Sequence, residues 1–182
     1  MITEGERATI GVILRRMHDS SIPVAIVMQR RALQNRWQSE VWEPLGIIAN
    51  HVARSGSRSG SRSDSIPEPS LLVEEGGNAQ WLHPGFELKL FRDETEGYYL
   101  NVSSNEPRVF VMWRMEDALA VPKFVTVSYN EAGRLMDGGE QVDTVPMPAE
   151  VMAWAGAYVE ENYRPEVKQR RRPQSFISPK VR

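Results

Sequence analysis

The arrangement of apolar and polar positions predicts strands over much of the chain. The run Val24 to Met28 is almost wholly apolar, and residues 41–46 form a second strand-like segment soon after it. Residues 86–90 and 98–102 each alternate apolar and polar side chains. Alternation with a period of two is typical of a strand that buries one face.

The two alternating segments predict a β-hairpin. Pairing Arg92 with Tyr98 places the even-numbered side chains of both segments on one face, with Leu90 opposite Leu100. Residues 93–97 would then form an acidic five-residue loop between the two strands.

Three further strands are predicted in the second half of the chain. Residues 109–113 are apolar on both faces, which is typical of a central strand that is covered on each side. Residues 124–127 and 141–147 predict two shorter strands.

Two helices are also predicted. Residues 131–137 form a short helix that Ser128 or Asn130 would cap, and two glycines follow it. A longer helix begins after Pro148 and has apolar residues at i, i+3, i+4, i+7 and i+8, a stripe suited to packing on a sheet. The stripe consists of Val151, Trp154, Ala155, Tyr158 and Val159.

These elements predict an α+β fold. Its main part would be an antiparallel sheet of about five to seven strands, open or partly closed, packed by the C-terminal amphipathic helix and one short helix. Residues 1–163 would form a single domain, interrupted at 54–69 by a flexible insert rich in Ser, Gly and Arg. The residues before the insert are too few to bury a core alone. Residues 164–182 would form a basic, disordered tail.

Charge separates the domain from the tail. The net charge is −2, but residues 164–182 hold seven Lys/Arg and one acid, which gives +6. Residues 1–163 hold the other 15 bases and 23 acids, which gives −8. An acidic body is a poor match to nucleic acid, so nucleic acid is not the expected partner. The tail itself is typical of a short docking peptide, since a basic run precedes an aromatic–aliphatic pair. Its candidate docking residues are Lys168, Arg170, Arg171, Arg172 and Phe176.

Motifs for catalysis are missing. The chain has no cysteine, which excludes disulfides, thiolate catalysis and cysteine-ligated metal centres. Its three histidines, His18, His51 and His83, do not have metal-ligand spacing, and no phosphate-binding or nucleophile motif is present. We therefore predict no catalytic residue, no metal and no cofactor. The longest apolar run near the N-terminus, Ala8 to Leu14, is too short for a membrane span, so we expect a cytoplasmic protein.

Two clusters remain as candidates for binding. Trp37 and Trp42 lie five residues apart; Trp42 is expected to be buried, whereas Trp37 with Arg36 is the better candidate for a surface contact. The second cluster joins the ionisable residues of 92–96 to Tyr98. Paired carboxylates can act as acid and base, although a solvated turn has the same sequence pattern.

The residues of these clusters also carry a resemblance. The chain is similar to an uncharacterised proteobacterial family, a domain of unknown function encoded in operons for molybdenum-dependent formate dehydrogenase. The resemblance covers roughly residues 22–163. Its three elements are Asn35-Arg36-Trp37 through Trp42-Glu43-Pro44, then Arg92 to Tyr98 with Asn101, and Pro107-Arg108-Val109 with Val145-Pro146-Met147-Pro148.

The resemblance implies a non-catalytic accessory protein that binds a formate dehydrogenase subunit or one of its maturation factors. One alternative is a protein or enzyme that binds a nucleotide or the molybdenum cofactor, with Arg92, Glu94 and Glu96 in the site. Another is nucleic-acid binding through the tail. The expected partner-binding residues are Arg36, Trp37, Trp42, Arg92, Glu94, Glu96, Tyr98 and Asn101.

Overall fold

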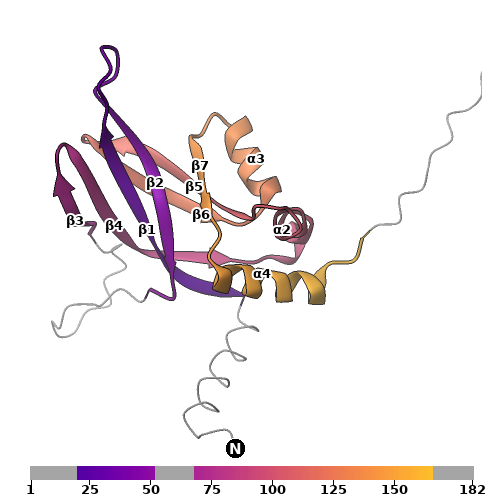
Figure 1. Cartoon of the computed structure of the whole chain (residues 1–182). Coiled ribbons are helices and arrows are strands. Elements are labelled where there is room, and N and C mark those ends of the chain that lie inside the picture. Colours follow the sequence, from indigo (N-terminus) through magenta and orange to yellow (C-terminus); the bar gives the residue numbers. More distant parts are fainter. Residues whose placement is uncertain (1–19, 52–67, 166–182) are drawn as a thin grey trace, which may run out of the picture.

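The computed structural model describes residues 20–51 and 68–165. Most of the predicted insert at 54–69 lies outside the described residues. So does the predicted tail beyond Pro165, with its docking residues Lys168, Arg170, Arg171, Arg172 and Phe176. Figure 1 shows the described part as two sheets with helices at one end.

The first sheet has four antiparallel strands. They are β1 (Ser21–Ala32), β2 (Glu40–Ala49), β3 (Ser70–Glu75) and β4 (Asn78–Lys89), in the order β2-β1-β4-β3. Each of the three pairings contains one shift of register. Such bulges increase the local twist, which helps the sheet to curve around a core.

The second sheet has three antiparallel strands. They are β5 (Arg108–Glu116), β6 (Leu119–Thr126) and β7 (Val142–Pro146), in the order β6-β5-β7. The central strand β5 confirms the prediction for residues 109–113, since Val109, Phe110 and Val111 are all buried.

Three helices and one 3-10 turn complete the described part. They are η1 (Arg92–Glu94), α2 (Thr95–Val102), α3 (Tyr129–Asp137) and α4 (Ala149–Asn162). In Figure 1, α4 runs along the foot of the sheets, α2 lies beside its C-terminal half and α3 lies beside β7.

The two predicted helices are confirmed, with their local signals. The Ser128 hydroxyl oxygen accepts a hydrogen bond of 3.1 Å from the Glu131 N–H and so caps α3. Gly139 has a φ of 83°, and the Glu140 N–H donates to the Leu135 carbonyl, which is a Schellman end. In α4, four of the five stripe residues are buried, namely Val151, Trp154, Ala155 and Val159.

The α+β class with antiparallel strands is confirmed, but the arrangement in one sheet is wrong. Seven strands are present in the described residues, divided four and three between two sheets. The division falls after β4, where the chain enters η1 and α2 before it returns as β5. β4 finds its partners in β1 and β3, so β5 begins a new sheet with β6 and β7.

The predicted hairpin is also wrong, because its second strand is helix α2. Leu90 therefore has no partner strand at Leu100, and β4 pairs with β1 instead. The buried residues of α2 include Thr95, Tyr98 and Asn101, at the three-residue spacing of a helix face. Two of these three are polar, so the apolar pattern of the sequence concealed the helical period.

Candidate functional site

The turn between β1 and β2, residues 33–39, exposes the Trp37 side chain to solvent. The Leu33 N–H donates to the Ser39 carbonyl at 2.8 Å and closes the turn. Inside it, the Asn35 carboxamide oxygen accepts a 3.0 Å bond from the Trp37 N–H. Trp37 is 87% exposed, and the Arg36 guanidinium carbon lies 5.5 Å from its ring centroid. We call residues 33–39 the Trp37 turn.

A tryptophan–arginine cluster fixes the strands that carry this turn. The Trp42 and Trp81 rings lie 5.0 Å apart, and the Arg30 guanidinium carbon is 5.9 and 5.5 Å from their centroids. The Trp42 indole N–H donates to Glu40 at 3.1 Å, and Arg30 donates to Glu74 on β3 at 3.2 Å. Trp42 is 8% exposed, which confirms its predicted burial. Trp42 therefore supports the Trp37 turn indirectly, because its ring packs β2 against Trp81 of β4.

In the segment 92–101, Glu94 points towards α3. Its carboxylate accepts a 2.7 Å hydrogen bond from the Ser128 hydroxyl and pairs with Arg134. Because the Ser128 oxygen in turn accepts the Glu131 N–H, Glu94 extends the N-terminal cap of α3. Gly97 also lies against Ser128, so closely that a Cβ atom at position 97 would overlap the Ser128 hydroxyl.

Tyr98 and Asn101 lie in the core. The Phe91 N–H donates to the Tyr98 hydroxyl at 3.1 Å, and burial raises the pKa of Tyr98 above its usual value. The Asn101 carboxamide N–H groups donate to the Arg108 and Val127 carbonyls, each at 2.7 Å. Its oxygen accepts the Arg108 N–H at 2.9 Å, so this one side chain joins α2 to the start of β5 and to the residue that follows β6.

The structure therefore does not bring all the predicted binding residues together. The Trp37 turn lies at the upper left of Figure 1, whereas η1 and α2 lie at the right. Of the predicted residues in the second cluster, Arg92 and Glu96 are exposed, Glu94 is mostly covered, and Tyr98 and Asn101 are buried. Their role in binding a partner stays a prediction.

A cavity between the sheets has no counterpart in the sequence analysis. It has a volume of about 270 Å³. His83 on β4 is 4% exposed, its Nε2 atom has no hydrogen-bond partner, and burial lowers its pKa to about 4. The imidazole is therefore neutral at pH 7. The other lining residues are Glu68, Pro69, Pro84, Phe86, Val121, Pro122 and Lys123.

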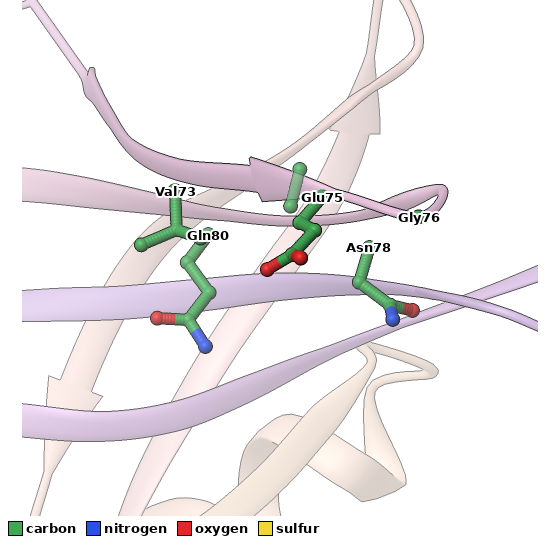
Figure 2. A pocket seen from close by; sticks show the side chains of 6 residues that line it. Val73, Glu75, Gly76, Asn78 and Gln80 are labelled. Atoms are coloured by element: carbon green, nitrogen blue, oxygen red, sulfur yellow. The ribbon is translucent and has the colours of Figure 1, made fainter.

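A second hollow of about 270 Å³ lies on the β3–β4 hairpin. In the view of Figure 2, the Glu75 carboxylate lies between the amide side chains of Gln80 and Asn78. Asn78 is already engaged, because its side-chain oxygen accepts the Ala32 N–H at 2.9 Å. The hollow contains no nucleophile and no second charged group, so it offers no chemistry beyond hydrogen bonding.

In 20–51 and 68–165, no three side chains of His, Asp or Glu are grouped so that they could hold a metal ion. No helix in this part of the chain is long and apolar enough to cross a membrane.

Comparison with known proteins identifies a family. The family model described as "Protein of unknown function (DUF3305)" matches residues 23–172, which is most of the chain. The match begins near the expected start of the resemblance and extends past residue 163 through the basic run. No curated protein matches, and no solved structure matches. The chain belongs to the family of unknown function DUF3305.

Proposed function

We propose that the protein is a non-catalytic interaction protein that binds a protein partner through the Trp37 turn. One observation carries this proposal: Trp37 is 87% exposed although local hydrogen bonds hold its backbone. A large indole on a backbone that is already held in place loses less conformational freedom on association than one on an unstructured loop. Tryptophan and arginine are also the residues that most often dominate the binding energy of an interface.

The partner follows from the resemblance of the sequence. We propose a molybdenum formate dehydrogenase subunit or one of its maturation factors, met in the cytoplasm. Arg36 would add a charged donor beside the indole, and the cluster of Arg30, Trp42 and Trp81 would keep the strands below the turn rigid.

The test is affinity purification of the tagged chain from cells that make formate dehydrogenase, followed by mass spectrometry. We expect the dehydrogenase or a maturation factor to be recovered with the native chain. Combining Trp37→Ala with Arg36→Ala should lower that recovery by at least about tenfold, since loss of a dominant interface residue costs about 2 kcal/mol or more.

Met136→Ala is the matched control, because Met136 is an exposed apolar side chain on α3, 46% exposed. Its recovery of the partner should equal that of the native chain. Equal recovery by the Trp37/Arg36 variant would rule out the Trp37 turn as the binding site.

The His83 cavity supports a second candidate, the binding of a small molecule such as a nucleotide or a fragment of the molybdenum cofactor. Its apolar lining with a few polar groups is typical of ligand pockets. A ligand present at 100 times its dissociation constant should add about 2.7 kcal/mol to the free energy of unfolding. Thermal-shift measurements with nucleotides and pterins would detect this. No shift with any of them would exclude this candidate for those ligands.

A further inference from the structure

Helix α2 presents apolar side chains to solvent. Tyr99 and Leu100 are 40% and 47% exposed, and Phe91, just before η1, is 50% exposed. Within the same short segment, Tyr98 faces inwards and meets the Tyr158 ring of α4 at 6.2 Å. The outward-facing residues are therefore additional to those that attach α2 to the core.

η1, α2 and α4 also carry exposed acidic side chains, together with one exposed base, Arg92. Asp93 and Glu96 on η1 and α2, and Glu160 and Glu161 on α4, are exposed, and none forms an ion pair within residues 20–51 and 68–165. Arg92, Asp93 and Glu161 all act electrostatically on Tyr158, so η1 and α4 contribute two acids and one base to one place. We call the seven outward-facing residues the α2–α4 surface: Phe91, Asp93, Glu96, Tyr99, Leu100, Glu160 and Glu161.

The chain leaves α4 beside this surface. The Tyr163 ring stacks on the Tyr99 ring with centroids 4.5 Å apart. Arg164 then donates to the carbonyls of Glu160 and Tyr163, at 3.2 and 2.9 Å. In Figure 1 the C-terminal half of α4 lies next to α2, so residues 166–182 start from the edge of the α2–α4 surface.

We propose that the α2–α4 surface binds residues 166–182 of the same chain. This segment has six Lys/Arg and one Glu, a net charge of +5, and it contains Phe176. The surface offers four acids without an ion pair in the described residues, together with exposed aromatic and aliphatic side chains, so charge and apolar character match on both sides.

The length of the segment suits the proposal. An extended chain spans about 3.3–3.6 Å per residue, so Lys168 to Arg172 lie within about 30 Å of Arg164. Tethering raises the effective concentration of the segment to the millimolar range, which lets individually weak exposed ion pairs act together. The family match also extends through Arg172, so the basic run belongs to the matched region. The proposal is independent of the Trp37 turn.

The chain has no cysteine, which permits a single-label test in the full-length protein. A nitroxide attached through Ser178→Cys should broaden the amide NMR signals of Tyr99, Leu100 and Glu161. Signals of β3, at the opposite side of Figure 1, should stay sharp. At about 1 M salt, where the Debye length is about 3 Å, the broadening should fall.

Charge-neutralising variants show whether this surface is the site. Asp93→Asn, Glu96→Gln, Glu160→Gln and Glu161→Gln combined should abolish the broadening. The matched control removes four exposed acids elsewhere, by Glu68→Gln, Glu75→Gln, Asp117→Asn and Asp137→Asn, and should leave the broadening intact.

Three results would overturn the proposal. The first is unbroadened spectra, and the second is broadening that the acid variants and their control reduce equally. The third is equal broadening when a spin-labelled chain without ¹⁵N is mixed with a ¹⁵N chain that carries no spin label, because the segment would then bind a second copy.

Discussion

Gly97 of α2 lies directly against Ser128, the residue that caps α3. A Cβ atom at position 97 would be 2.2 Å from the Ser128 hydroxyl oxygen and 3.1 Å from the Asn130 nitrogen. The glycine is required here by the close approach of two helices, since the hydroxyl is fixed between Glu94 and the Glu131 N–H. Through this contact the segment 92–101 packs against α3 and contributes to the stability of the fold.

Gly97→Ala should therefore destabilise the protein. The added methyl group must displace the capping serine or separate α2 from α3, and overpacking of this kind costs about 1–3 kcal/mol. Gly133→Ala on α3 is the control, because a Cβ atom added at position 133 would meet nothing within 4 Å. Gly133→Ala should raise the free energy of unfolding by about 0.5–1 kcal/mol, because alanine favours a helix more than glycine does. Urea denaturation measures both, and equal midpoints would contradict the close-contact assignment.

Asn101→Ala should be among the more damaging polar substitutions. It leaves the Arg108 N–H and the carbonyls of Arg108 and Val127 without their partner. At about 1–3 kcal/mol for each buried unpaired group, the loss should reach about 3 kcal/mol or more. Asn105→Ala, at an exposed position, should change the free energy of unfolding by no more than about 0.5 kcal/mol.

Asn101→Asp separates the donor role of this side chain from its size. A carboxylate would face two carbonyl oxygens at neutral pH, whereas the protonated acid can donate one hydrogen bond. The deficit relative to the native chain should therefore shrink as the pH falls towards 4. Denaturation curves at several pH values measure it, and a deficit independent of pH would show that the donors are not important.

Arg30→Lys should loosen the tryptophan cluster. Lysine keeps the charge but loses the planar group that lies near both indoles and reaches Glu74. The loss should be about 1–2 kcal/mol, with a weaker near-UV circular dichroism signal from the Trp42–Trp81 pair. Arg31→Lys alters only an exposed ion pair with Glu43 and should stay within about 0.5 kcal/mol. Equal effects of the two changes would argue against a role for stacking.

His83 should make stability depend on pH. Its pKa is lowered by burial from 6.5 to about 4, so between these values the unfolded chain binds a proton that the folded chain does not. Stability is then complete above pH 6.5 and is lost as the pH falls towards 4, with a slope of up to about 1.4 kcal/mol per pH unit. His83→Gln should remove this part of the slope. If the free energy of unfolding varied with pH in the same way for the native protein and for His83→Gln between pH 7 and 4, the role of His83 would be contradicted.

The elements with local signals were predictable from the sequence. Three such signals involve only neighbouring residues, and all three are confirmed: the apolar stripe of α4, the Ser128 cap of α3, and the run of β5 that is apolar on both faces. The exposure of Trp37 and the burial of Trp42 also followed from their neighbours, because Trp37 lies among polar residues and Trp42 alternates along a strand.

Helix α2 could not be predicted in this way. Tyr98, Leu100 and Val102 alternate as in a strand, yet Leu100 is half exposed and the buried face includes Thr95 and Asn101. The residues that satisfy Asn101 and Glu94 lie up to 40 positions away in the chain. No local sequence pattern indicates such distant contacts. The division into two sheets was missed for the same reason, because η1 and α2 separate β4 from β5.

The bonds of Asn101 also bear on the order in which the protein folds. Helix α2 has eight residues and includes a glycine, so it has little tendency to form alone. The Asn101 carboxamide, near the end of α2, is satisfied by Arg108 at the beginning of β5 and by Val127, the residue that follows β6. We expect the amide protons of α2 to gain protection from exchange after those of β5 and β6, so that α2 packs on the second sheet late in folding.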